Sequence, residues 1–459
     1  MIKRSGERTA ILVADLGYGD SGKGVTIDAL AEKYHAHAVV RYNGGAQAAH
    51  TVTTPDGRVH TFAQFGSATF LPEVVTYLSE YMLVDPLALV NEEAHLAQVG
   101  VHDAFAWLYI DESALMLTPF ARALNRLNEI ARNETRFGSC GMGVGETVRF
   151  ANKNPREALQ MKDMLDPLLL QAKLAGQQET MRDMLPTFAH ELQNDLVVKE
   201  ELAILNDLSL PERLASRYQE IVKKFQIVGE EWGNAFFKKS GVILFESAQG
   251  VLLDQQFGFA PYTTWSNTTF KNAEAILDKF DFRGERIRLG VVRAYGTRHG
   301  PGPFVTESPE LTKLLPDTHN IFNEWQRTFR VGWFDAVATR YALRVVGGVD
   351  GLVITNIDRI SKLTEWRFAD TYDVGSDEFL RDLEFSPASN YTDQEKLSKL
   401  LFRTKPVYQR LSLDPNMQHS LTEGAHSLFD EIEKALGAPV RLVGHGPSRT
   451  QKYWRGNIF

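Results

Sequence analysis

The chain of 459 residues contains a single cysteine, Cys140, so it cannot form an internal disulfide. A lack of disulfides is typical of proteins in a reducing compartment. No stretch approaches the roughly 20 consecutive apolar residues of a membrane-spanning helix. The first apolar run is broken by Asp15 and leads into glycines rather than into a signal-peptide cleavage site. These absences predict a cytoplasmic protein without a membrane anchor.

Basic residues are outnumbered, with 50 Lys and Arg against 58 Asp and Glu and a formal net charge of −8. A general nucleic-acid-binding protein needs a basic surface for the phosphates. The acidic balance therefore argues against a nucleic-acid partner. It leaves room for a local basic pocket that binds one nucleotide.

Apolar runs and helical periodicity alternate along the chain. A β-rich run at 10–14, glycines at 17, 19, 22 and 24, a helical pattern at 25–34 and an apolar run at 38–42 form one strand–loop–helix–strand unit. Further helices are expected at 112–135 and 424–437, and further strands at 242–245, 287–292, 351–354 and 440–443. The charged, leucine-containing stretch 151–240 has few glycines and prolines and is expected to be a helical subdomain.

This alternation predicts an α/β fold with a large, mostly parallel, twisted sheet covered by helices. We expect residues 1–459 to form a single domain into which the helical subdomain at 151–240 is inserted.

The sharpest motif is GYGDSGKG at 17–24, which nearly fits the phosphate-loop pattern GxxxxGK[ST]. Glycines allow backbone N–H groups to approach phosphate oxygens, and Lys23 adds a positive charge. The usual Ser or Thr that binds magnesium is replaced by Gly24. Asp20, inside the loop, is then the obvious carboxylate for a metal ion. A purely structural glycine turn is the alternative, but the position between a strand and a helix favours a phosphate loop.

A second loop at 41–51 places one histidine, His50, among small residues. Small residues let a backbone approach a ligand closely, and a histidine can act there as an acid or an electrostatic stabiliser. A lone histidine in a loop is ordinarily a hydrogen-bonded surface residue. The position of His50 just after the second strand of the phosphate-loop unit favours a functional role.

These two loops resemble the GDEGKG and GGHNAGHT motifs of the adenylosuccinate synthetases. Further segments resemble motifs of that family in the same order along the chain, at 245–250 (FESAQG), 252–254, 261–269, 295–307, 332–335, 355–358 and 446–450. One such motif would be weak, but the ordered series covers nearly the whole chain.

The family phosphorylates the 6-oxygen of IMP with GTP, and the amine of aspartate then displaces the phosphate. The resemblance implies that Asp20 takes the N1 proton and, with Ala49, holds the Mg²⁺ cofactor, while His50 stabilises the transferring phosphoryl group. Lys23 and Gln249 complete the implied catalytic set. This chemistry suits the residues, because a ring must be deprotonated to make its oxygen nucleophilic and phosphoryl transfer needs cations and loop N–H groups.

The resemblance also implies two nucleotide sites and a homodimer in which an arginine of the partner reaches the nucleotide. Arg149 is the candidate for that arginine. The implied GTP-binding positions are Gly19, Ser21, Gly22, Lys23, Gly24, His50, Thr51, Asn356, Asp358, Gly444, Gly446 and Pro447. The implied positions for the purine nucleotide are Asp20, Gln47, Ser139, Cys140, Arg149, Gln249, Thr264 and Arg327.

Asp358 favours GTP over ATP, because a carboxylate matches the N1–H and N2–H₂ edge of guanine and adenine offers no such pair of donors. On its own, an aspartate at this position could equally cap a turn after a strand.

Several positions depart from the family motifs. Ser21 replaces a glutamate, Gln47 an asparagine and Cys140 a threonine, and Asn356 replaces a lysine. The glycine-rich loop at 138–143 lacks the arginine of the family motif. We interpret Cys140 as a pocket-lining substitution and not as a nucleophile.

The largest departure is the loop 324–330, where the family carries TTGRRRR. Arg327 and Arg330 remain, and two cations suit the carboxylates of an amino acid. The threonine pair is absent, so aspartate and a different amino acid both stay open. A phage-type group of relatives aminates a guanine nucleotide and has a changed loop aspartate. Retention of Asp20 favours a 6-oxopurine without a 2-amino group.

The sequence therefore predicts a GTP-dependent carbon–nitrogen ligase acting on IMP and aspartate. A related ligase that uses a guanine nucleotide or another amino acid is the first alternative. A plain nucleotide hydrolase or kinase, and a nucleotide-sensing regulatory protein derived from the synthetase, are the others. Retention of the reacting centre favours the ligase.

Overall fold

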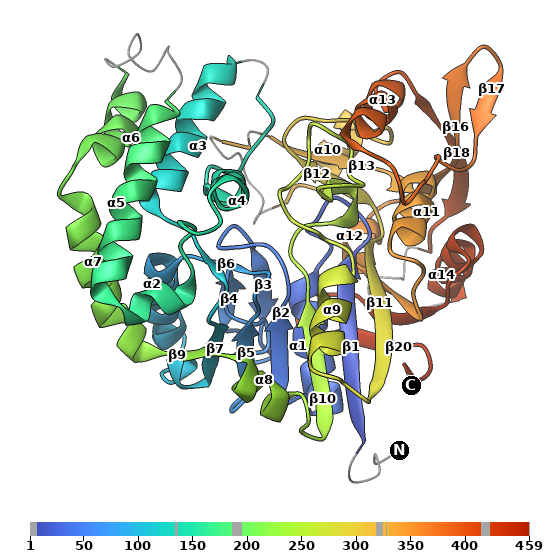
Figure 1. Cartoon of the computed structure of the whole chain (residues 1–459). Coiled ribbons are helices and arrows are strands. Elements are labelled where there is room, and N and C mark those ends of the chain that lie inside the picture. Colours follow the sequence, from blue (N-terminus) through green and yellow to red (C-terminus); the bar gives the residue numbers. More distant parts are fainter. Residues whose placement is uncertain are drawn as a thin grey trace.

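A computed structural model describes residues 7–133, 136–185, 195–317, 325–326, 328–414 and 423–458. Its centre is a ten-stranded sheet that is parallel except for one edge strand (Figure 1). The strand order is β20 (Lys452–Trp454), β19 (Val440–Gly444), β15 (Gly351–Thr355), β11 (Glu285–Arg293), β1 (Arg8–Asp15), β10 (Gly241–Glu246), β2 (Ala38–Arg41), β5 (Val75–Leu78), β7 (Leu108–Asp111) and β9 (Gln226–Val228).

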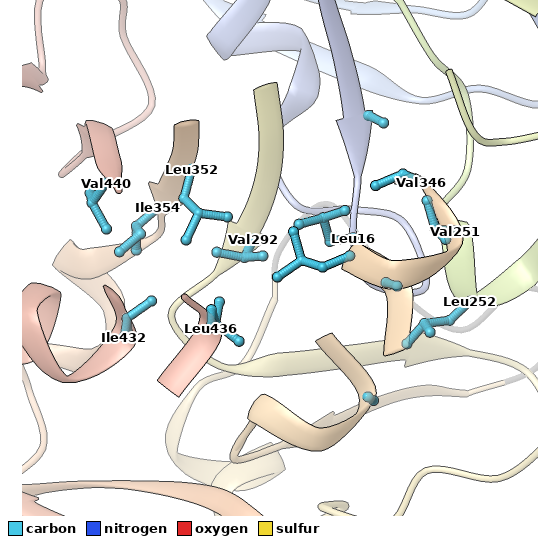
Figure 2. Packing of buried hydrophobic residues seen from close by; sticks show 14 of the residues in the cluster. Leu16, Val251, Leu252, Val292, Val346, Leu352, Ile354, Ile432, Leu436 and Val440 are labelled. Carbon is cyan, nitrogen blue, oxygen red and sulfur yellow. The ribbon is translucent and has the colours of Figure 1, made fainter. Parts of the chain in front are cut away.

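The sheet is buried on both faces, as a parallel sheet requires. On β1, Leu12 and Ala14 face one core, and Ile11 and Val13 face the other. Helix α1 (Lys23–Tyr34) packs in the second core. The first core is filled from α9 (Lys271–Lys279), α11 (Ala336–Val345) and α14 (Glu423–Leu436). Figure 2 shows part of it, with side chains of β15, β19 and α14 close together.

A third core belongs to a group of helices beside the β7 end of the sheet (Figure 1). These helices are α2 (Pro86–Gln98), α3 (Pro119–Arg132), α4 (Val144–Lys153), α5 (Pro167–Asp183), α6 (Leu196–Asn206) and α7 (Leu210–Ile221). The stretch expected to be a helical subdomain, 151–240, contains α5, α6 and α7. It also contains β9, which pairs with β7, and α8 (Glu230–Phe236). Strand β9 has only three residues and was too short to be recognised in the sequence.

The expected elements at 10–14, 25–34, 38–42, 242–245, 287–292, 351–354, 424–437 and 440–443 are confirmed, with ends shifted by two residues or fewer. The helix expected at 112–135 was wrong at its start. Leu115 and Met116 form the short strand β8 (Leu115–Met116), which pairs with β6 (Leu83–Val84). Helix α3 begins only after Thr118, whose hydroxyl accepts a hydrogen bond from the Ala121 N–H at 3.3 Å.

Smaller strand units surround the sheet and were not predicted. One is the hairpin of β3 (His50–Thr53) with β4 (Val59–Phe62), and another is the antiparallel pair of β12 (Gly296–His299) with β13 (Phe329–Gly332), which are far apart in the sequence. A third unit joins β14 (Phe334–Asp335), β16 (Glu365–Gly375), β17 (Glu378–Leu380) and β18 (Lys405–Ser412) on the side away from the helical group (Figure 1). The remaining helices are α10 (Pro309–Leu314), α12 (Ile357–Ile360) and α13 (Tyr391–Leu401). Of the helices in the described ranges, none is long and apolar enough to cross a membrane.

Candidate active site

The loops that follow β1, β2, β10 and β11 meet at one edge of the sheet around a cavity of about 650 Å³. The carboxyl ends of parallel strands are the usual place for ligand sites in such folds. The cavity is lined by all four residues predicted to be catalytic, Asp20, Lys23, His50 and Gln249. The phosphate loop supplies two of them, the β2–β3 connection leads to the third, and the loop after β10 supplies the last.

Two of these residues have unusual backbone conformations. Asp20 and Gln249 have φ values of 59° and 57°, in the left-handed region that non-glycine residues rarely adopt. Their loops touch at Gly250, where a Cβ atom would lie 2.2 Å from the Gly17 carbonyl oxygen, so no larger residue fits. Asn43 exchanges hydrogen bonds with the Ala248 N–H (2.7 Å) and carbonyl (3.0 Å) and fixes the second loop from its other side.

His50 is held by a buried glutamate. Its Nδ1 lies 2.5 Å from Oε1 of Glu246, and both side chains are nearly inaccessible to solvent. Burial acts to raise the pKa of Glu246, but the charge of Arg41 and the hydrogen bonds from His50 and Ser67 hold it down at about 2. An ionised carboxylate can only accept, so Nδ1 of His50 carries the proton. The Nε2 atom is then the ring nitrogen left for a ligand in the cavity.

Burial also acts on His50 itself. It lowers the pKa of the imidazole below its ordinary value, against the opposing hydrogen bond and charge of Glu246. The nearby cations Arg41 and Lys23 lower the pKa further. The resting site therefore pairs a neutral imidazole with an ionised glutamate.

Gly24 stands where ordinary phosphate loops carry a Ser or Thr, and the structure gives a steric reason. A Cβ atom on Gly24 would lie 2.8 Å from Cβ of His50 and 3.0 Å from its carbonyl carbon. Helix α1 packs directly against the first residue of β3 at this point. A hydroxyl-bearing residue cannot occupy position 24 while His50 lines the cavity.

The outer wall of the cavity contains Gln47, Ser139, Cys140, Thr264 and Arg149, all predicted to contact the purine nucleotide. Arg149 forms an ion pair with Glu146 (2.8 Å) and lies over the Trp265 ring at 5.3 Å. In this chain Arg149 lines the cavity, and the expectation that it reaches the nucleotide of a partner subunit stays a prediction. Burial raises the pKa of the Cys140 thiol, which agrees with a lining role and argues against a nucleophile.

Five of the residues predicted to bind GTP lie outside this cavity, at the ends of two neighbouring strands. Asn356, Asp358, Gly444, Gly446 and Pro447 follow the neighbouring strands β15 and β19. The hydroxyl of Thr355, the last residue of β15, donates to the Ser21 carbonyl at 2.7 Å and connects this region to the phosphate loop. Thr51, also predicted to bind GTP, does not line the cavity either, and its hydroxyl is 2.9 Å from that of Thr61 within the β3–β4 hairpin.

Lys452 is a member of this region that the sequence analysis missed. Its Nζ donates to the carbonyls of Gly446 (2.9 Å) and Ser448 (2.8 Å) and holds the loop 444–451 in shape. Burial lowers its pKa to about 8, although the charge of Asp358 opposes the shift. No motif included this lysine, because its role comes from packing against β19.

Only part of the amino-acid loop can be placed, because Glu324 and Arg327 lie outside the described residues. Arg330 is on β13, where its guanidinium contacts Glu307 (2.8 Å) and the Gly302 carbonyl (2.9 Å). Gln326 lines the cavity, whereas Arg330 does not. The guanidinium of Arg330 is thus already paired within the protein.

Two further cavity residues were not predicted as site residues. His299, on β12, places its Nε2 3.5 Å from Oδ2 of Asp20. Trp265 contributes a ring that is 44% exposed. Both residues lie inside segments that resemble family motifs, at positions where this chain differs from the motif. Those differences could have identified them as site residues from the sequence.

Comparisons with known proteins identify the family. The family described as adenylosuccinate synthetase matches residues 12–453. The adenylosuccinate synthetase of Magnetococcus marinus is 28% identical to the chain, and the match covers 98% of this chain and 99% of that protein. The adenylosuccinate synthetase of Chlorobium limicola is 30% identical, and the match covers 98% of both chains.

Two solved structures share the fold. The adenylosuccinate synthetase of Plasmodium falciparum superimposes with a TM-score of 0.77 at 21% identity, covering 97% of this chain and 99% of that one. The succinoaminodeoxyadenylate synthetase of cyanophage S-2L superimposes with a TM-score of 0.59 at 15% identity, covering 98% of this chain and 97% of that one. With the family matching almost the entire length, the chain belongs to the adenylosuccinate synthetase family, and it is a GTP-dependent ligase of purine synthesis that forms a carbon–nitrogen bond.

Proposed function

We propose that the enzyme joins the amine of aspartate to C6 of IMP at the expense of GTP, through a 6-phosphoryl intermediate. The observation that carries the proposal is the meeting of Asp20, Lys23, His50 and Gln249 in one cavity beside the phosphate loop. A carboxylate, an imidazole, a cation and an amide are the groups that this two-step reaction needs.

In the first step, Asp20 takes the N1 proton of the purine, so that the 6-oxygen becomes nucleophilic. Its side chain is 25% exposed and can meet a ligand in the cavity. The 6-oxygen forms a bond to the γ-phosphorus as the bond to the β-phosphate oxygen breaks, and GDP leaves. His50 and Lys23 face the charge that spreads over the transferring group.

In the second step, the amine nitrogen attacks C6 and the phosphate leaves with the 6-oxygen. The proton lost by the amine passes to solvent or to a nearby base. Gln249 is placed to hold the 6-position, because it lines the cavity next to Gly19 and Asp20 and its backbone is held in one conformation by the loop contact at Gly250.

The residues present fit Mg²⁺. Asp20 and Ala49 both line the cavity, the former offering a carboxylate and the latter a carbonyl oxygen. In the described ranges, no group of three or more His, Cys, Asp or Glu could hold a metal by itself. Mg²⁺ commonly keeps several waters and takes one or two protein oxygens together with substrate phosphates. When bound, it would supply positive charge to the phosphates.

A different amino-acid substrate is the second candidate, and the pairing of Arg330 favours it. With that guanidinium engaged by Glu307, Arg327 is left as the predicted contact for a substrate carboxylate. The phage relative is described as bound to dGMP and dATP. Asp20, which suits the N1–H of IMP, and Asp358, which suits guanine in the donor, favour IMP and GTP for this chain. We also propose that residues 1–459 act as one catalytic unit within a homodimer.

The deciding experiment measures phosphate release from GTP with IMP across a panel of amino acids, with the product mass determined for each. We expect aspartate to give the highest rate and a product with the mass of adenylosuccinate. Asp20→Asn should lower the rate about 10²–10⁴-fold. Asp56→Asn, which changes a surface carboxylate that is 58% exposed, is the matched control and should keep the rate. Turnover without IMP, or none with any amino acid, would contradict the proposal.

A further inference from the structure

We propose that Asp15, the last residue of β1, is a positioning residue for GTP binding. It ties Lys23 and the phosphate loop into their nucleotide-binding arrangement before the donor arrives. The inference rests on the proposed use of GTP as donor. Asp15 belongs to none of the motifs that led to the family.

The carboxylate of Asp15 is fully buried and accepts four hydrogen bonds from the loop. Its Oδ1 accepts from the Gly17 N–H (2.9 Å) and the Ser21 hydroxyl (2.9 Å). Its Oδ2 accepts from the Ser21 N–H (3.1 Å) and the Lys23 ammonium (2.8 Å). A carboxylate has about four lone-pair sites, so this one is saturated by a single loop.

The carboxylate therefore holds the loop 17–23 from the inside. The loop is also held from the outside, because the Leu252 N–H donates to the Gly17 carbonyl (3.0 Å) and Thr355 donates to the Ser21 carbonyl (2.7 Å). The same two residues, Gly17 and Ser21, are thus anchored on both sides. Asp20 lies between them, and its left-handed backbone conformation is imposed by these anchors.

The ion pair also gives the buried side chain of Lys23 a partner of opposite charge. Its side chain is 3% exposed, and a buried ammonium without a partner is strongly disfavoured. Lys23 nevertheless lines the cavity beside the phosphate loop. The segment that resembles the family motif GDEGKG has Ser21 in place of the glutamate. In this chain, the second carboxylate of the loop comes from the end of β1 and binds that same serine.

Asp15 acts through other residues and not on the substrate. It is not among the residues that line the cavity, and it has no exposed surface. Its effect should therefore appear in the binding of the donor nucleotide and be much weaker for the acceptor nucleotide.

The test is direct binding of GTP and of IMP to the full-length enzyme by calorimetry, with Asp15→Asn as the variant. We expect the Kd for GTP to rise about tenfold or more, because coupled groups in one hydrogen-bonded network depend on one another. The Kd for IMP should change less than about twofold, since sites without shared partners are nearly independent. An unchanged or lower Kd for GTP would overturn the inference, and a lower value would mean that Asp15 competes with the phosphates for Lys23.

Asp163→Asn is the matched control. Asp163, in the short 3-10 helix Met161–Leu165, is 2% exposed, pairs with Lys173 at 2.9 Å and does not line the cavity. Its loss should lower the melting temperature while leaving the Kd for GTP unchanged. If Asp163→Asn weakened GTP binding as much as Asp15→Asn, the effect would be general destabilisation and the positioning role would be wrong.

A double-mutant cycle with Lys23→Ala separates positioning from a purely structural role. In the Lys23→Ala background, Asp15→Asn should cost less GTP affinity than it does in the wild type, whereas independent effects would add in full. Additive losses would overturn the inference.

If Asp15→Asn does not fold, Ser21→Ala is the substitute variant, because it removes one of the four hydrogen bonds to the Asp15 carboxylate. A Kd for GTP equal to that of the wild type would then refute the positioning role of Asp15. Wild-type enzyme that binds no GTP would instead refute the proposed donor, a result distinct from all of these.

Discussion

Replacement of Glu246 by glutamine tests whether His50 depends on a buried charge. The variant keeps the shape of the side chain and removes the negative charge that faces His50 and Arg41. Its amide oxygen can still accept the Ser67 N–H, which lies 3.0 Å from Oε2 in the wild type. The amide NH₂ of the new glutamine would then face Nδ1 of His50. Because an amide NH₂ can only donate, Nδ1 must become the acceptor, and the proton of the neutral imidazole must move from Nδ1 to Nε2.

Two magnitudes follow from the structure. A histidine held in the other tautomer presents the wrong atom to the ligand, and we expect kcat to fall about 10²–10⁴-fold. The variant also removes the negative charge that interacts electrostatically with Arg41, which is completely buried. The free energy of unfolding at pH 7 should then fall by about 3–5 kcal/mol.

The pH dependence gives an independent check. The pKa of Glu246 is lowered from 4.5 to about 2 in the folded protein, so its stabilising contribution is present above pH 4.5 and is lost as the pH falls through 2. This contribution is about 3 kcal/mol, since each pKa unit corresponds to about 1.4 kcal/mol. The difference in unfolding free energy between wild type and Glu246→Gln should therefore narrow as the pH is lowered from 4.5 towards 2.

The assay combines kcat for GTP- and IMP-dependent phosphate release with urea unfolding over this pH range. Glu92→Gln is the control, because Glu92 is also a buried carboxylate and accepts N–H groups of the loop at 63–65, yet does not line the cavity. We expect Glu92→Gln to lose stability and keep kcat. Normal turnover by Glu246→Gln, or a stability difference that does not depend on pH, would refute the reasoning.

Three further predictions concern the nucleotide and amino-acid sites. Gly24→Ser restores the residue of ordinary phosphate loops but places a Cβ 2.8 Å from that of His50, so we expect phosphate release to be lost and not improved; a gain would show that His50 can move. Asp358→Asn should raise the KM for GTP and reduce the preference over ATP, because a carboxylate facing guanine donors is lost at a cost of about 1–3 kcal/mol; an unchanged GTP-to-ATP ratio in kcat/KM would show that Asp358 does not read the base. Arg327→Ala should raise the KM for the amino acid sharply and leave that for GTP nearly unchanged, and the converse result would place Arg327 elsewhere.

The parts of the site that could be predicted were those encoded by neighbouring residues. The phosphate loop and the segment around His50 are short, and closely spaced glycines and small residues are typical of loops whose backbone contacts a ligand. The bond between His50 and Glu246 joins positions 196 residues apart, so no local pattern contains it. Asp15 illustrates the same limit, because as a residue at the end of an apolar strand it resembles a simple strand terminator until the loop is seen folded around it.

In the fold, too, local elements could be predicted and contacts between distant segments could not. The strand–loop–helix–strand unit at the start of the chain is present, but its two strands are not neighbours, because β10 lies between β1 and β2. Hydrophobic periodicity marks that a strand exists and cannot say which strand pairs with it. The hairpin β3–β4 escaped prediction because its outward positions, such as Val59, break the usual alternation with one exposed apolar side chain.

The strand order has a consequence for how the protein is made. The two neighbours of β1 in the sheet are β10 and β11, which begin at Gly241 and Glu285. A ribosome must therefore synthesise more than half of the chain before the first strand can find either neighbour. Until then β1 and its apolar side chains lack their native cover, and contacts between such distant segments form slowly. The phosphate loop, although encoded near the start of the chain, can therefore take its native shape only after β10 and β11 have been made.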